Sequence, residues 1–350
     1  MKTTYLLLCL LGIGSVSGAG QTKQPQKIGD FIESTSYNEH RRNATRSLQY
    51  TPDGDDFVCI NGKNRFTRAL YGSHTAFRLE TSDRPVFAAY TKENPKHICF
   101  KLQTSGGTVA LDSTEHCESR YTAGRRSYSL SDPAFGGGSL SITTWALPDK
   151  EGAIWQFNAR NFKEFHPVLL ASISEIRNSK LNRNGDMGAD PADSFEAPLQ
   201  PQQLQSFPVQ IDGTLYILLE NQELRTLTTA EGENLFKKAE AARSETASRI
   251  RIETPDPYFN TLGGTLAMAA DGIWDGEVWL HGAIGWRMPL SGWRAAYTGD
   301  VLGWHDRART HFNAYAASQV TEVPNTFPHP AQDSALHLAC LLYTSPSPRD

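Results

Sequence analysis

Between about residues 57 and 227, short apolar runs rich in β-branched and aromatic residues alternate with polar turns, a pattern typical of β-strands. The runs lie at 57–60, 76–79, 86–90, 98–102, 139–147, 154–157, 168–170 and 214–219. Turn signals such as Asn61-Gly62 separate them. No helical pattern of about 10–15 residues intervenes, so parallel βαβ units are not expected. The pattern predicts an antiparallel β-sandwich.

The period of the apolar positions changes from that of a strand to that of a helix after Glu231. Apolar residues then recur at helical spacing among Lys, Arg and Glu, which predicts a charged linker helix. Two prolines next break the chain, and either Thr254 or Asp256 can cap the helix that follows. The expected helices span 231–253, about 258–274 and about 298–318.

The first 20 residues have the three parts of a secretory signal peptide. Lys2 supplies a positive charge, an apolar run follows at 6–14, and small residues occupy most of 15–20. The apolar run is nine residues long, which is short of the roughly 20 that a membrane-spanning helix needs. We therefore expect no membrane span, and a mature protein that is periplasmic or secreted.

The last eleven residues, 340–350, resemble the translation of a transposase sequencing adapter, codon for codon. We expect this segment to be an artefact and the natural sequence to be interrupted near Ala339. The domain organisation expected from the chain is then a signal peptide, a β-sandwich, a linker helix, the start of a helical domain and the adapter-like tail. Their ranges are 1–20, 21–230, 231–253, 254–339 and 340–350.

Composition narrows the possible partners. The 350 residues include 34 Lys+Arg and 38 Asp+Glu, so a net charge of −4 gives no reason to expect nucleic acid as a partner. No cofactor motif is found, and the oligomeric state is left open. The segment 182–193 resembles a calcium loop, but its sixth position is Met187 and its twelfth is Asp193, where the pattern needs Gly and Glu. No metal site is predicted.

Three cysteines lie between the two terminal segments: Cys59, Cys99 and Cys117. In an exported protein a Cys99–Cys117 disulfide is one option. The other is that all three are free, since buried free thiols are common.

Five of the seven tryptophans fall between residues 274 and 304, among Arg, His and Asp residues. Indole rings suit the C–H faces of sugars, although aromatic residues between helices also form cores. An oligo- or polysaccharide is the expected partner. The residues expected to contact it are Trp279, His281, Trp286, Arg287, Trp293, Arg294, Trp304 and His305.

Asp300 and Asp306 are the candidate catalytic carboxylates. On one continuous helix six residues turn through about 600°, so the two side chains would point to different faces. We therefore do not expect them to act as a pair. One would face a cleft, while the other would cap a helix or pair with Arg294, Arg307 or Arg309.

Seven motifs together resemble one family, the proteins with domain of unknown function 4450, which Gram-negative bacteria that degrade complex glycans export. The motifs are Phe57–Gly62, Arg65–Gly72, Gly185–Pro191, Thr254–Gly264, Leu280–Met288, Gly292–Arg294 and Gly303–Arg309. The resemblance covers about residues 45–325. It implies the architecture of six-hairpin glycosidases, a β-sandwich packed on an (α/α)6 toroid. This chain would hold only the first helices of an incomplete toroid.

The resemblance also implies a function. It favours a fragment of an exported glycoside hydrolase that acts on complex plant-type glycans. A relationship to glycoside hydrolase family 142 would imply β-L-arabinofuranosidase activity on pectic side chains. In similar enzymes the catalytic carboxylates come from later helices, so this fragment is expected to be inactive. The alternatives are a non-catalytic glycan-binding protein and a polysaccharide lyase on a similar toroid.

Overall fold

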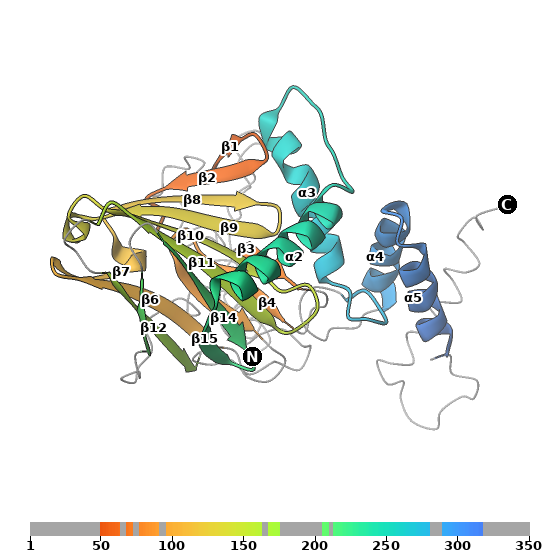
Figure 1. The fold of residues 1–350 in the computed structure, drawn as a ribbon. Coiled ribbons are helices and arrows are strands. Elements are labelled where there is room, and N and C mark those ends of the chain that lie inside the picture. The colour runs from red at the N-terminus through yellow and green to blue at the C-terminus, as the bar shows by residue number, and fades with distance from the viewer. Residues whose placement is uncertain are drawn as a thin grey trace, which may run out of the picture. The chain divides into compact units, whose positions relative to one another are not determined.

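The computed structural model describes residues 50–63, 68–72, 77–90, 96–162, 167–175, 205–209, 213–280 and 289–317, without the side chains of 68 and 289–294. All of them belong to one compact unit, residues 49–350. Figure 1 shows strands in the first part of this unit and helices in the second. In the described residues, no helix is long and apolar enough to cross a membrane. The signal-peptide and adapter predictions lie outside the described residues.

The described strands form two antiparallel sheets. Across the first sheet the order is β1 (Thr51–Asp53), β2 (Asp56–Ile60), β8 (His116–Thr122), β9 (Arg125–Ser131), β10 (Ser139–Ala146), β11 (Gly152–Arg160), β14 (Thr214–Glu220) and β15 (Glu223–Leu227). Across the second it is β13 (Gln205–Pro208), β12 (Val168–Glu175), β6 (Lys96–Thr104), β5 (Val86–Tyr90), β4 (Arg78–Thr81) and β3 (Arg68–Tyr71), and β7 (Gly107–Ala110) pairs with β6. Two short 3-10 helices, η1 (Leu111–Ser113) and η2 (Pro133–Phe135), lie between strands. The predicted antiparallel architecture is confirmed.

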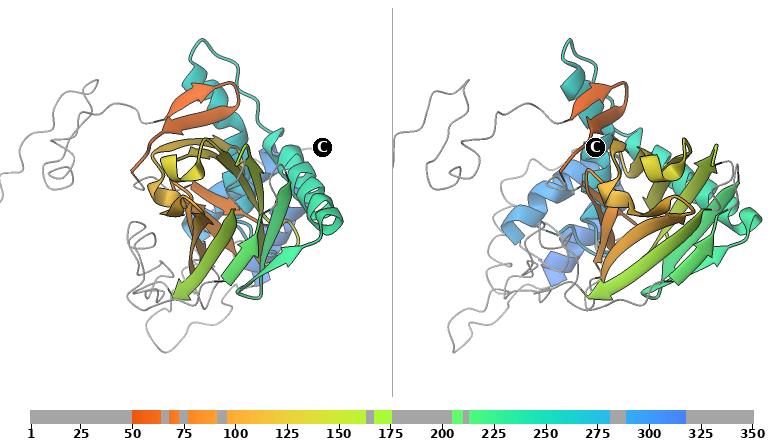
Figure 2. Two further views of the ribbon diagram at one scale, coloured as in Figure 1. Left: turned by 60° about the vertical axis from the view of Figure 1, so that its left-hand side comes forward. Right: turned by 90° about the vertical axis from the view of Figure 1, so that its left-hand side faces the viewer.

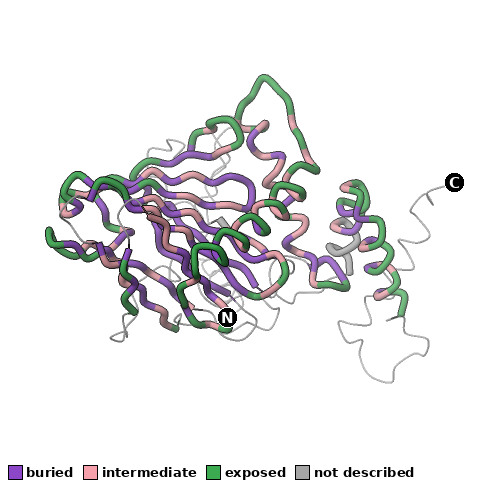
Figure 3. The backbone as a smooth tube through the Cα atoms, viewed as in Figure 1, coloured by how far each residue is buried: buried purple, intermediate pink, exposed green. Residues whose placement is uncertain are grey.

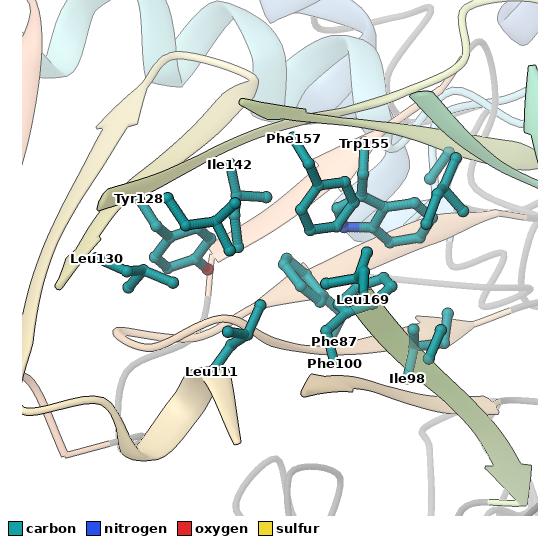
Figure 4. Packing of buried hydrophobic residues seen from close by; sticks show 14 of the residues in the cluster. Phe87, Ile98, Phe100, Leu111, Tyr128, Leu130, Ile142, Trp155, Phe157 and Leu169 are labelled. Atoms are coloured by element: carbon teal, nitrogen blue, oxygen red, sulfur yellow. The ribbon is translucent and has the colours of Figure 1, made fainter. Parts of the chain in front are cut away.

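The core lies between the inner faces of the two sheets. Phe87 and Phe100 of the second sheet meet Trp155 of the first at ring-centre distances of 5.4 and 5.7 Å, in edge-to-face geometry. Figure 4 shows these rings together with Phe157 and Leu169. Such pairs contribute about 0.5–1.5 kcal/mol beyond the burial of their area. Figure 3 shows buried positions running through the strands of both sheets.

A charged pair is buried within this core. The side chains of Arg126 on β9 and Asp83 between β4 and β5 have no exposed surface, and their closest charged atoms are 3.9 Å apart. Arg126 Nη2 also donates to the Tyr50 hydroxyl and to the Ser82 carbonyl, each at 2.8 Å. Because burying a charge without a partner is costly, each member of the pair requires the other.

The three described cysteines are free, so no disulfide forms among them. The Cys99–Cys117 pairing is wrong, because both thiols are free and each contacts another residue. Cys99 contacts the Ser172 hydroxyl at 2.8 Å, and the Cys117 thiol donates to the Asp83 carbonyl at 3.7 Å. Burial raises the pKa of Cys117 to about 12, so this thiol is not a reactive thiolate at neutral pH.

The linker helix is observed as α2 (Thr229–Ala247). It packs on the outer face of the first sheet, where Phe236 meets Trp145 at 4.0 Å between ring centres. The Trp145 Nε1 donates to Glu240 at 2.8 Å. Figure 2 shows α2 lying along this sheet in both views. The helix is therefore an integral part of the β domain and not a free linker.

α2 begins with a capping box formed by Thr228 and Glu231, in which each side chain bonds the other residue's backbone N–H. We expect Thr228→Ala to lower the free energy of unfolding by about 1 kcal/mol, because it leaves a helix N–H without its acceptor. Thr228→Ser should retain the stability, and Thr229→Ala, at the exposed neighbouring position, is the control. Urea denaturation measures the three variants. Equal stability of Thr228→Ala and Thr228→Ser would contradict this role.

Three helices follow: α3 (Pro257–Gly272), α4 (Pro289–Val301) and α5 (His305–Ala317). Of the two caps that the sequence allowed, Asp256 is the one observed, and it accepts from the Tyr258 N–H at 2.8 Å. A single helix over about 298–318 is wrong. α4 ends at Val301, two residues before Gly303, whose φ of +84° is in the left-handed region. The N–H groups of Gly303 and Trp304 bond back to the carbonyls of Asp300 and Gly299. This arrangement is a Schellman motif, which ends a helix.

Candidate functional site

Trp279 is a core residue in this structure. Its side chain has no exposed surface, its Nε1 donates to the Ala270 carbonyl at 3.0 Å, and its ring centre is 4.6 Å from that of Trp274. Gly299 of α4 makes room for it, since a Cβ there would lie 2.2 Å from the indole. The indole has no exposed surface that a ligand could contact. Trp279 therefore packs in the core, and the prediction that it contacts a sugar is corrected.

Asp300, His305 and Asp306 are exposed, and the structure does not bring the two carboxylates together. Asp300 Oδ1 lies 2.6 Å from His305 Nδ1. Asp306 accepts from Arg309 at 3.0 Å, which is one of the partners the sequence analysis named. Each carboxylate has its own neighbour, and the helix break at Gly303 separates them. Neither lines the cleft described below.

Five of the predicted sugar contacts have side chains outside the described set. His281, Trp286 and Arg287 lie outside the described residues. Trp293 and Arg294 lie on α4, but their side chains are outside the described set. Of the predicted sugar contacts, Trp304 is the one that both has a described side chain and lines a cleft.

The cleft has a volume of about 340 Å³ and lies where α2 and α3 meet the start of α5. Its walls also include the ends of β3 and β10. The lining residues are Tyr71, Gly72, Gly124, Trp145, Ala146, Pro148, Ala239, Ala242, Arg243, Glu245, Thr246, Arg249, Met268, Asp271, Trp304 and Arg307. Its size is within the range of small-molecule sites, roughly 300–1,000 Å³.

Asp271 is the most deeply placed acid of the cleft. It lies in the last turn of α3 with 13% of its side chain exposed, and its Oδ1 is 2.5 Å from Arg307 Nη1. Burial raises the pKa of Asp271, and the charge of Glu245 adds to this effect, while Arg307 opposes it. An acid with a raised pKa in a cleft is a candidate proton donor.

Two arginines lie over the ring of Trp304. The guanidinium carbons of Arg249 and Arg307 lie 5.1 and 4.8 Å from the ring centre, which is cation–π geometry. Arg249 Nη1 also donates to the Leu302 carbonyl at 2.8 Å. These contacts tie the segment after α2 to the α4–α5 junction.

Arg243 of α2 also lines the cleft and is held in an ion pair with Glu240. Arg243 donates from Nε and Nη2 to the two carboxylate oxygens of Glu240, at 2.8 and 2.6 Å. Burial acts to raise the pKa of Glu240, but hydrogen bonds from Arg243 and Trp145 outweigh it and hold the pKa below its ordinary value. These partners favour the ionised form of Glu240, whereas burial acts in the opposite direction on Asp271.

Sequence reasoning did not single out Asp271, although a local signal exists. Carboxylates in the last turn of a helix are opposed by the helix dipole, and α3 has no basic residue in that turn. Such a conflict between sequence and local structure points to a partner elsewhere in the fold, here Arg307 of α5. Among the described residues, no group of three His, Cys, Asp or Glu side chains could hold a metal ion.

The raised pKa of Asp271 has a measurable consequence. The folded chain binds this proton more tightly than the unfolded chain, so the contribution of Asp271 to stability falls as pH rises above about 3.9, its ordinary pKa. We expect Asp271→Asn to gain stability relative to the parent chain as pH rises through this window. Urea denaturation between about pH 3 and 7 tests it. The same pH dependence in Asp55→Asn, at an exposed turn position, would contradict it.

These features define a class of protein: an antiparallel two-sheet β domain joined by a packed helix to further helices, with a charged and aromatic cleft at the junction. Residues 95–250 match the family described as Domain of unknown function (DUF4450). This match supports the family that the motifs resemble. The match runs from the start of β6 through α2 and includes Arg243, Glu245 and Arg249 of the cleft. No curated protein matches the chain.

Proposed function

We propose that the chain is part of an exported glycoside hydrolase that acts on complex plant-type glycans, and that the cleft binds a sugar of the substrate. The observation that carries the proposal is a buried carboxyl of raised pKa, Asp271, in a cleft that also presents an indole, Trp304. Glycosidases use a carboxylic acid to protonate the leaving oxygen. Aromatic rings and fixed donors hold the sugar.

Asp271 would be the general acid in this proposal, which therefore departs from the expectation that the fragment is inactive. Its O–H would transfer the proton to the glycosidic oxygen as the bond to the anomeric carbon breaks. Glu245, which lines the same cleft and whose charge acts on Asp271, would be the second carboxylate. It would assist the water molecule whose oxygen forms the new bond to the anomeric carbon. Arg307 would then stabilise the Asp271 carboxylate that remains after proton transfer.

The Asp271–Arg307 ion pair favours a second candidate function. Arg307 Nη1 is 2.5 Å from one oxygen of the Asp271 carboxyl. A carboxyl held in this way suits the recognition of a ligand more than proton transfer, in which it must lose and regain its proton. In this case the chain would be a non-catalytic glycan-binding protein that uses the same cleft. It would bind glycans without releasing sugar.

The test uses the full chain with a panel of pectin-derived oligosaccharides. Release of reducing sugar measures hydrolysis, and calorimetric titration measures binding. We expect Asp271→Asn to lower hydrolysis by about 10²–10⁴-fold and Asp55→Asn, outside the cleft, to leave it unchanged. Binding without release would replace hydrolysis by the second candidate. An unsaturated product that absorbs in the near ultraviolet would identify a lyase instead, and the absence of both binding and release would overturn the proposal.

A further inference from the structure

We infer that Trp304 is a positioning residue: its indole holds the Arg307 guanidinium in place beside Asp271, the acid of the proposed reaction. The inference rests on the proposed function and adds the role of the indole in the same cleft. Asp271 lies in the last turn of α3, Trp304 in the junction between α4 and α5, and Arg307 in the first turn of α5. All three line the cleft.

Arg307 is held against Asp271 by a single hydrogen bond. Its Nη1 donates to Asp271 Oδ1 at 2.5 Å, and among the described residues this is the only hydrogen bond that its side chain makes. An arginine side chain is long and has many rotamers, and 32% of this one is exposed. One hydrogen bond leaves such a side chain free to turn, so the position of the guanidinium depends on its other contacts.

Two indole rings supply those contacts. The guanidinium carbon of Arg307 lies 4.8 Å from the ring centre of Trp304 and 5.7 Å from that of Trp274, both within cation–π range. The two tryptophans are 9% and 7% exposed, and both belong to one buried cluster with Trp279. Because neighbouring side chains fix these rings, the rings in turn fix Arg307. Trp304 is the nearer of the two and the one that lines the cleft.

The contacts of Trp304 leave little of its ring for a ligand. Arg249 also lies over the ring, with its guanidinium carbon 5.1 Å from the centre, and Trp304 as a whole is 9% exposed. A sugar that stacks on an indole needs an open ring face. A direct contact between Trp304 and a sugar is therefore confined to the small exposed part of the ring, whereas its contact with Arg307 acts on the carboxyl that carries the proton.

The position of Arg307 matters to Asp271 because the other surroundings of this acid disfavour the carboxylate. Burial raises the pKa of Asp271, and the charge of Glu245 acts in the same direction. The C-terminal end of α3 also opposes a negative charge. Arg307 is the strongest opposing influence, and Arg249 adds to it. If Arg307 moves away, the pKa of Asp271 rises further, and the pH above which this acid loses its proton rises with it.

The experiment measures kcat and KM of the full chain against pH, on the pectin-derived oligosaccharide that the panel shows to be hydrolysed fastest. We expect Trp304→Leu to lower kcat about tenfold and to leave KM within about twofold, because it disturbs the acid and not the binding of the sugar. The upper pH limit of kcat should move to higher pH by at least about 0.5 unit. Trp304→Phe, which keeps a weaker aromatic contact, should give a smaller change in the same direction and carries the test if Trp304→Leu does not fold.

A second measurement does not depend on activity: carbon-13 NMR titration of the Asp271 carboxyl, assigned with Asp271→Asn. Arg307→Gln should raise the midpoint of this titration. The double variant Trp304→Leu, Arg307→Gln should raise it no further, because Trp304 acts through Arg307. Two controls should leave the midpoint unchanged: Trp279→Phe, in the same cluster but not in the cleft, and Arg309→Gln, an exposed arginine of α5 outside the cleft.

A Trp304→Leu variant that raises KM and keeps the parent kcat would overturn the inference in favour of direct stacking of the sugar on the indole. An unchanged Asp271 midpoint in both Trp304 variants, or additive shifts in the double variant, would overturn it as well. If no oligosaccharide is hydrolysed, the proposed hydrolysis fails, and the titration alone decides whether Trp304 positions Arg307.

Discussion

Asp83→Asn is expected to lower the free energy of unfolding by about 3–5 kcal/mol, because it leaves Arg126 charged and buried without its counter-ion. Both side chains are fully buried, so water cannot replace the lost carboxylate. The shape of the side chain is nearly unchanged, which separates the loss of charge from the loss of packing. Urea denaturation followed by tryptophan fluorescence measures the effect.

Asp53→Asn is the matched control for this prediction. Asp53 pairs with Arg120 at 2.8 Å on the surface, where 64% of its side chain is exposed, and its loss is expected to cost less than about 1 kcal/mol. The double variant Asp83→Asn, Arg126→Met should be more stable than Asp83→Asn alone, because it removes the unpaired charge. If Asp83→Asn and Asp53→Asn were equally stable, the buried pair would not have the role assigned to it.

Trp279→Ala is expected to lower the free energy of unfolding of the helical part by about 3–5 kcal/mol, the usual loss for a buried aromatic residue. The indole packs against Trp274 and Gly299, and the Trp279 backbone N–H donates to His311 Nδ1 at 3.0 Å. The truncation therefore leaves a cavity among α3, α4 and α5. Hydrogen exchange of these helices, together with chemical denaturation, measures the loss.

Val301→Ala on α4 is the control for Trp279→Ala, because Val301 is 88% exposed and surface substitutions of this kind stay within about 0.5 kcal/mol. The outcome distinguishes the two interpretations of the tryptophan cluster. A variant Trp279→Ala that kept its stability but lost glycan affinity would restore Trp279 to the sugar site. Loss of stability in Trp279→Ala and none in Val301→Ala is the result that the structure predicts.

The apolar strands were predictable because each is a continuous run that is buried between the sheets. β5 is the clearest example: all five of its residues are buried. β8 and β9 were missed, since their sequences contain many charged and hydroxyl residues. They are nevertheless central strands of the first sheet. Their buried positions include Ser119 and Arg126. Arg126 donates to the Tyr50 hydroxyl and lies 3.9 Å from Asp83, and both of these residues are distant in the chain.

In the helical region, too, some features could be predicted from local sequence and others could not. The cap at Asp256 and the start of α3 were predictable from local sequence, because capping involves only neighbouring residues. The end of α4 was missed, although Gly303 is a recognised helix-stop signal. Apolar residues recur at helical spacing on both sides of Gly303, and this spacing alone predicts one continuous helix. The glycine, and not the apolar spacing, decided where the helix ends.

By itself, the sequence determined the change from strands to helices along the chain, the antiparallel class of the sheets and the family resemblance, since these depend on local periodicity, turn residues and motifs. Only the tertiary structure decided which tryptophan packs and which lines a cleft. It also decided that Asp271 lines the cleft and has a raised pKa. The physical reason is that burial and charge pairing are set by residues far apart in the chain. Asp271 of α3 pairs with Arg307 of α5, and Arg249, which follows α2, lies over the ring of Trp304, which follows α4.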